Sequence, residues 1–68
     1  MNNKRFYQMN EQTIINLNNV NTVEIYESFS LGVWSTYLEV TFTNGKTQTY
    51  AMEDKTIATA KMKTMMNM

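Results

Sequence analysis

The chain has 68 residues, equal numbers of acidic and basic side chains, and neither cysteine nor histidine. These counts exclude disulfides and common zinc sites, and the balanced charge argues against binding duplex DNA through many phosphate contacts. A chain this short is expected to be one domain, residues 1–68, which buries only about 60% of its unfolded surface. Without a disulfide or an ordinary zinc site to stabilise it, we expect a homo-oligomer.

The sequence also gives expectations about location. No apolar run approaches about 20 residues, so we expect neither a membrane span nor a membrane partner. Residues 1–5 are not followed by the apolar stretch of a signal peptide, which favours a cytoplasmic protein. The asparagine-rich composition is common in AT-rich bacterial genomes and their phages, and it indicates a phage or mobile-element protein.

The sequence leaves the structure of the first ten residues open and predicts a strand after them. Residues 1–10 fit either a flexible arm or an extra edge strand, since chain ends are loose unless a sheet holds them. Residues 13–17 then predict a strand. The following Asn18 and Asn19 favour a turn, because asparagine tolerates left-handed backbone angles and bonds its own backbone.

Alternation of apolar and polar residues predicts the next strand at 22–27. Side chains alternate across a strand, so Ile25 faces the core and Tyr26 faces outward. Phe29 and Leu31 follow this strand in a predicted loop. Large apolar residues in such a loop are expected to cap one end of the core.

The strongest local signal is Asn44-Gly45, which lies between two alternating runs at 34–42 and 47–52. It predicts a β-hairpin with a two-residue type I′ turn, in which both central residues have positive φ. A two-residue loop would place Leu38 opposite Ala51.

This register divides the hairpin into two faces. One face would carry bulky residues beside small ones and so form a trough for another element: Trp34, Thr36, Leu38, Val40 and Phe42 beside Thr47, Thr49 and Ala51. The opposite face would be aromatic at one end and polar at the other: Tyr37, Glu39, Thr41, Gln48, Tyr50 and Met52.

Residues 53–68 predict a C-terminal helix with Asp54 as its N-cap. Its apolar residues share one half of the helix surface and are expected to pack into the trough: Ile57, Ala58, Met62, Met65, Met66 and Met68. The predicted fold is therefore α+β, a small antiparallel four-stranded sheet with the order β-β-β-β-α and the helix on one face.

Enzymatic chemistry is not expected from this composition. Histidine and cysteine are absent, the serines lack a nucleophile-elbow motif, and two glycines cannot form a phosphate-binding or dinucleotide-binding loop. Glu24 and Glu27 would point to opposite faces of a strand, and Glu53 with Asp54 begins a helix. We therefore expect no catalytic residues, no bound metal and no cofactor.

The tyrosines are the first candidate for a binding surface. Tyr26, Tyr37 and Tyr50 are predicted to share the outer face of the sheet with Met52. Such a face could be a subunit or partner interface, a plain surface, or a platform on which nucleobases stack. The strand and helix order is similar to that of dimeric single-strand DNA-binding coactivators, but the predicted face lacks their basic residues.

The methionines near the C-terminus are the second candidate. Met62, Met65 and Met66 could fill the core or form contacts between the helices of two copies, since methionine adapts to irregular surfaces. The sequence as a whole favours a small non-enzymatic interaction protein, an adaptor or inhibitor that binds protein partners as a homo-oligomer. A single-stranded nucleic-acid-binding protein that uses the tyrosines is the alternative.

Overall fold

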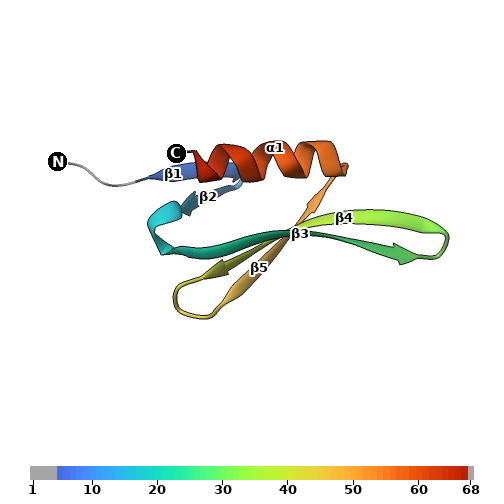
Figure 1. Cartoon of the computed structure of the whole chain (residues 1–68), viewed down its shortest axis with the longest axis horizontal. Coiled ribbons are helices and arrows are strands. Elements are labelled where there is room, and N and C mark those ends of the chain that lie inside the picture. The colour runs from blue at the N-terminus through green and yellow to red at the C-terminus, as the bar shows by residue number, and fades with distance from the viewer. Residues whose placement is uncertain (1–4, 68) are drawn as a thin grey trace.

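The computed structural model describes residues 5–67 and has an α+β fold of antiparallel strands followed by a C-terminal helix (Figure 1). The predicted fold class is confirmed. The elements are β1 (Phe6–Asn10), β2 (Thr13–Asn16), a 3-10 turn η1 (Leu17–Asn19), β3 (Val20–Ser30), β4 (Val33–Phe42), β5 (Thr47–Met52) and α1 (Lys55–Met66). β1 is the extra strand, one of the two alternatives given for residues 1–10, and residues 1–4 and Met68 lie outside the described part.

The strands form two sheets rather than one four-stranded sheet, with β1 paired to β2 and β4 between β3 and β5. Figure 1 shows α1 and the β1–β2 pair on the same side of the three-stranded sheet. The core between these layers is made by buried side chains from both sheets, η1 and α1: Met9, Ile15, Leu17, Leu38, Val40 and Met65.

The helix is held at its start and along its length. The Oδ1 atom of Asp54 accepts a hydrogen bond from the backbone N–H of Ile57 at 2.8 Å, which confirms the predicted N-cap. Further along, the Nζ atom of Lys61 donates to the carbonyl oxygen of Met9 at 3.0 Å and lies 5.9 Å from the ring centre of Tyr7. The two contacts of Lys61 join α1 to β1.

The predicted type I′ turn at Asn44-Gly45 is wrong. Gly45 has a φ of +88°, but Asn44 has no positive φ. The N–H of Gly45 donates to the carbonyl of Phe42 at 2.9 Å, and the N–H of Phe42 donates to the carbonyl of Lys46 at 2.8 Å. This pattern is a three-residue loop, a tight turn followed by a glycine in the left-handed region.

The longer loop shifts the register of β5 by one residue. Leu38 pairs with Tyr50, not with Ala51. Because neighbouring positions on a strand face opposite sides, the shift exchanges the two faces of β5. Tyr50 and Met52 therefore lie half-buried on the core side, where α1 packs. The predicted trough is also wrong, because its small residues are exposed on the opposite face: Thr47, Thr49 and Ala51.

Candidate interaction surface

The β3–β4 hairpin extends well beyond the rest of the sheet. β5 ends at Met52, which pairs with Thr36, and the sheet then continues as β3 and β4 alone as far as the Ser30–Val33 pair. Residues 28–35, here called the projecting ribbon, form one end of a molecule that measures 50 × 23 × 20 Å (Figure 1). A two-stranded ribbon is only marginally stable in water, so this segment gains little from its own contacts.

The ribbon ends in the type I′ turn that the sequence predicted elsewhere. Leu31 has a φ of +52° and Gly32 a φ of +77°, and they join the paired residues Ser30 and Val33. Positive φ suits glycine, asparagine and aspartate, but it brings the side chain of any other residue too close to the backbone. Leucine at this position is therefore unfavourable for folding.

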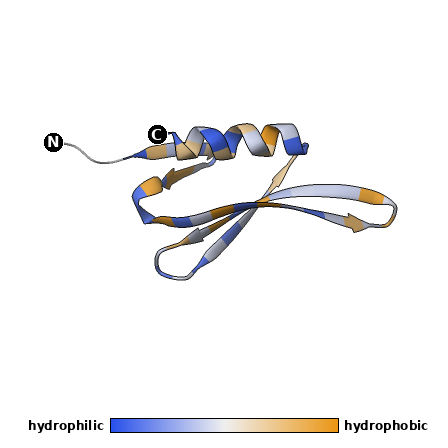
Figure 2. Ribbon diagram, in the orientation of Figure 1, coloured by the Kyte–Doolittle hydropathy of each residue, from blue (hydrophilic) through white to orange (hydrophobic). Residues whose placement is uncertain are grey.

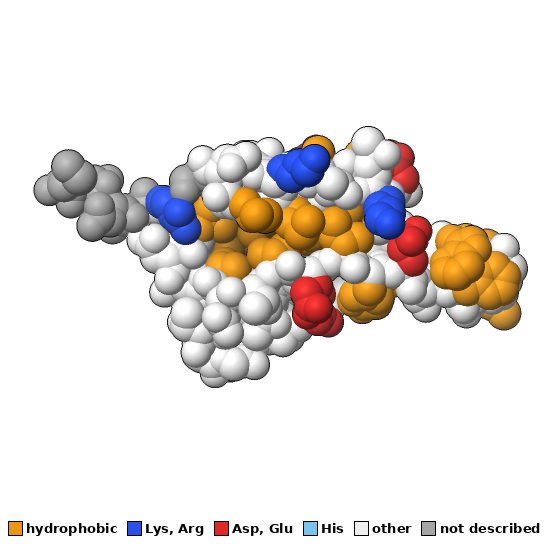
Figure 3. All heavy atoms as spheres, in the orientation of Figure 1, with side chains coloured by type: hydrophobic (Ala, Val, Ile, Leu, Met, Phe, Trp, Pro, Cys, Tyr) orange, Lys and Arg blue, Asp and Glu red, His pale blue; other side chains and the backbone are white. Residues whose placement is uncertain are grey.

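The ribbon carries four of the large exposed hydrophobic residues of the chain, here called the apolar tip. Their exposed fractions are 58% for Phe29, 98% for Leu31, 60% for Val33 and 66% for Trp34. The rings of Phe29 and Trp34 are in contact, with centres 5.0 Å apart and planes inclined by 53°. Figure 3 shows this hydrophobic group at the end of the hairpin, away from α1, and Figure 2 shows separate hydrophobic positions along the ribbon there. No charged residue occurs from 28 to 38.

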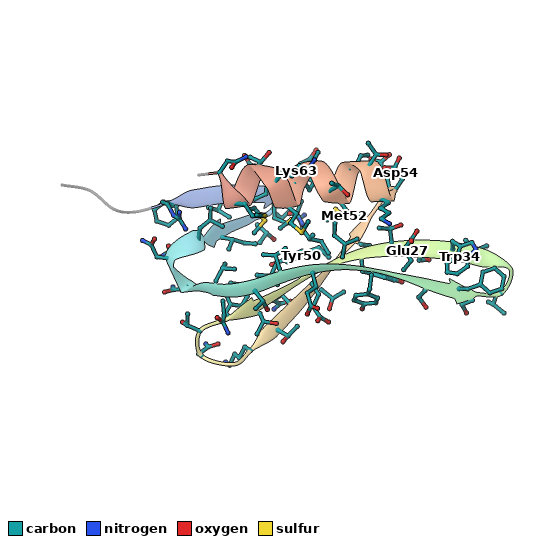
Figure 4. All side chains as sticks on the ribbon, in the orientation of Figure 1. Glu27, Trp34, Tyr50, Met52, Asp54 and Lys63 are labelled. Atoms are coloured by element: carbon teal, nitrogen blue, oxygen red, sulfur yellow. The ribbon has the colours of Figure 1, made fainter. Side chains whose placement is uncertain are left out.

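These residues correct a prediction. Phe29 and Leu31 were expected to cap the core, and Trp34 to lie under the helix. Trp34 does lie on the helix side of the sheet, since its neighbours Thr36 and Leu38 on that face are buried. The helix does not extend over Trp34, however, and Figure 4 shows this side chain at the far end of the hairpin from α1.

A groove lies near the opposite end of the molecule, between the C-terminal half of α1 and the start of β3. It has a volume of about 370 Å³, and six of its nine lining residues are apolar. We call it the methionine groove, and its lining residues are Arg5, Leu17, Val20, Asn21, Thr22, Val23, Met62, Met65 and Met66. Figure 3 shows apolar side chains exposed in the hollow beneath α1.

The three methionines predicted as a contact surface meet in this groove, with different exposure. Met65 is buried and belongs to the core, Met62 is half-buried, and Met66 is 72% exposed. Met65 fills the core, which is one of the two alternatives given by the sequence. Met66 offers an exposed, flexible apolar side chain, and the other alternative, contact between the helices of two copies, stays a prediction.

The predicted tyrosine face is divided. Tyr26 and Tyr37 pair across β3 and β4 on the face away from α1, with ring centres 5.2 Å apart and planes inclined by 27°. Next to them, Glu24 pairs with Glu39 on the same face. Two carboxylates placed directly opposite each other repel, and they give this face a negative character.

The other two residues of that predicted face, Tyr50 and Met52, lie on the core side. Figure 4 shows both between the sheet and α1. Partial burial raises the pKa of the Tyr50 phenol, because the low-dielectric surroundings disfavour the charged form. Tyr50 and Met52 therefore support the core and do not continue the surface that Tyr26 and Tyr37 form.

The apolar tip was missed as a site because burial is the usual state of phenylalanine, leucine and tryptophan. One signal in the sequence could have indicated it. The segment from Ser28 to Leu38 has alternating strand-like residues on both sides of Leu31-Gly32 and no charge, which fits a second hairpin that extends into solvent. The absence of asparagine or aspartate before Gly32 hid this turn.

The described residues show neither a group of three or more metal-binding side chains nor a helix that is long and apolar enough to cross a membrane. Comparison of the chain with protein-family models, with curated proteins and with solved structures gave no match. Functional inference therefore rests on the apolar tip, the methionine groove and the tyrosine pair.

Proposed function

We propose that this chain is a small non-enzymatic interaction protein, an adaptor or inhibitor that acts through protein–protein contacts as a homo-oligomer. The observation that carries the proposal is the apolar tip, where Phe29, Leu31, Val33 and Trp34 are all more than half exposed. Contiguous exposed apolar groups that project from a small domain mark a surface that a partner covers. A phage or mobile-element origin and a cytoplasmic location belong to the same proposal and are supported by composition alone.

Sedimentation velocity and light scattering across a dilution series test the homo-oligomer. The monomer has a mass of 8.0 kDa, so a dimer or larger assembly is easily resolved. We expect a mass above that of the monomer, with dissociation on dilution. A monomer at every concentration up to the solubility limit would contradict self-association.

The alternative function, binding of single-stranded nucleic acid, has one observation in its favour. Tyr26 and Tyr37 form a stacked pair on the sheet face opposite to the one that α1 and the β1–β2 pair cover (Figure 1), and exposed aromatic rings on a sheet can stack bases. Glu24 and Glu39 oppose this function, because they would repel the phosphate backbone. Tyrosine fluorescence, titrated with a short oligonucleotide at low salt, distinguishes the two. Salt-sensitive quenching that is lost in Tyr37→Ala would favour the alternative.

A further inference from the structure

We infer that the apolar tip of one chain occupies the methionine groove of a second copy, and that the contact is reciprocal, so that each dimer contains two tip–groove contacts. This inference rests on the proposed homo-oligomer and specifies its interface. It follows from the positions of the two surfaces, their chemistry, the area they offer, and the residue at the turn.

The two surfaces are placed so that two copies can exchange them. The apolar tip and the methionine groove lie near opposite ends of the long axis, and Figure 3 shows both on one face of the molecule. If two copies face each other with their long axes antiparallel, each tip lies against the groove of the other. This arrangement has two-fold symmetry, which is the commonest symmetry of soluble oligomers, and it closes without leaving a free tip.

The chemistry of the two surfaces is complementary. Flexible methionine side chains adapt to the shape of a partner and make favourable sulfur–aromatic contacts, which suits the rings of Phe29 and Trp34. Arg5 also lines the groove, and a guanidinium group binds well over an indole ring. The tip carries no charge that would have to leave water when it enters an apolar groove.

The charge distribution favours a protein over a membrane as the binding partner of the apolar tip. Residues 6–45 contain no lysine or arginine, and the charged residues nearest to the ribbon in the sequence are Glu27 before it and Glu39 after it. Anionic lipid surfaces attract clusters of basic residues and repel acidic ones. The tip therefore lacks the electrostatic attraction that would hold it at a membrane.

The available area explains why the contact must occur twice. Val33 pairs with Ser30 and faces the opposite side of the ribbon from its neighbour Trp34. Aromatic side chains bury about 150–250 Å² each, so the two partly exposed rings with Leu31 offer on the order of 300–400 Å² to a groove. A standard stable interface buries roughly 800 Å² on each partner. One tip in one groove is too small. When each copy contributes both its tip and its groove, the area buried on each partner doubles to roughly 600–800 Å², which lies within the range of standard interfaces.

The residue at the turn supports recognition rather than folding. Leu31 occupies a position with positive φ that asparagine would adopt with less strain, and its side chain is 98% exposed. It contributes almost no burial within its own chain. A leucine here is useful if a second copy covers it, and then it is the foremost apolar group to enter the groove.

The test compares one tip variant, one groove variant and one control by sedimentation equilibrium. Leu31→Asn keeps the turn, and Met66→Glu places a charge at the rim of the groove. Ile14→Ser is the matched control, because Ile14 is 66% exposed but belongs to neither surface. We expect each of the first two to weaken dimerisation about tenfold or more per contact, hence about a hundredfold for two contacts, and the control to have no effect.

Trp34 is the single tryptophan of the chain and reports on the contact directly. In the wild type, its emission should shift to shorter wavelength as the protein concentrates, and this shift should be absent in Met66→Glu. A dimer that Met66→Glu leaves intact while Leu31→Asn dissociates it would indicate tip-to-tip pairing and overturn the inference. A dimer indifferent to both variants would overturn it too and leave the homo-oligomer standing.

A wild-type monomer would refute the homo-oligomer and the inferred contact together. Phosphatidylcholine vesicles, with and without phosphatidylserine, test whether the apolar tip binds a membrane instead. A blue shift of Trp34 on adding vesicles to dilute protein, lost in Leu31→Asn but retained in Met66→Glu, would assign the tip to a membrane instead. No shift with either vesicle is the expected result.

Discussion

Replacement of Leu31 by asparagine should make the isolated chain more stable. For a residue other than glycine, the left-handed region costs roughly 1–2 kcal/mol, and asparagine visits it much more readily than leucine. Leu31 has a φ of +52° and is 98% exposed, so its removal sacrifices almost no burial within the chain. We expect a gain of about 1 kcal/mol, which raises the melting temperature by roughly 4–8 °C in a domain of this size.

Urea and thermal unfolding, followed by circular dichroism on dilute protein, measure this gain without a contribution from association. Leu31→Ala is the matched control, because it removes the same apolar side chain but lacks the short polar group through which asparagine hydrogen-bonds locally and tolerates positive φ. Leu31→Asn should therefore be more stable than both the wild type and Leu31→Ala. If the asparagine variant is no more stable than the alanine variant, the strain assigned to this turn is refuted.

Four further predictions concern single contacts. Gly45→Val should lower the free energy of unfolding by about 1–2 kcal/mol, and Gly45→Asn should lower it by less. Nothing lies within 4 Å of an added Cβ, so only the φ of +88° opposes these side chains. Equal losses of the two variants in urea unfolding would contradict this. Asp54→Ala should lower the free energy of unfolding by about 0.5–2 kcal/mol and reduce the helical ellipticity. Asp54→Asn keeps the capping oxygen, so both losses should be much smaller. The pKa of Tyr50 is raised in the folded state, so its contribution to stability is complete below the ordinary tyrosine pKa of about 10 and disappears as the pH rises through the folded value. Tyr50→Phe should reduce that alkaline loss in unfolding measured at stepped pH, and an identical loss would show that other groups cause it. Glu39→Lys should place a positive charge opposite Glu24 and raise the free energy of unfolding by a few tenths of a kcal/mol at low salt. A gain that does not shrink with added salt would not be electrostatic.

Much of the fold follows from local patterns in the sequence. Alternation along β4 correctly placed Leu38 and Val40 in the core, and Asp54 begins the helix as its chemistry predicts. Ile25 packs against the core, and Tyr26 stacks on the outer face with Tyr37, as the period of two requires. These features depend on residues close together in the chain, and the sequence contains the information that fixes them.

The position of β5 could not be fixed in the same way. Asn44-Gly45 suits a two-residue loop with positive φ at both positions, and it equally suits a three-residue loop with positive φ at glycine alone. The two loops differ by one residue in register, and one residue moves Tyr50 from the outer face to the core. Packing of Tyr50 and Met52 against the core favours the observed register, and that contact is not visible in the turn itself.

The apolar tip has a different origin, which is a mismatch of lengths between the layers of the fold. α1 has 12 residues and spans about 18 Å, whereas β3 has 11 residues and spans about 36 Å. A helix of that length can cover only about half of the hairpin, whatever the hydrophobic pattern of the uncovered half. Phe29 and Trp34 lie on the same face of the sheet as the core, beyond the Glu27–Thr36 pair and past the point where the helix covers the sheet. If a second copy supplies the missing cover, the ribbon can be shortened by removing residues 29–34 and joining Ser28 to Ser35 with Asn-Gly. This variant should be a folded monomer, since no core residue lies within the removed segment. Loss of folding on dilution, rather than loss of dimerisation alone, would show that the ribbon stabilises its own chain.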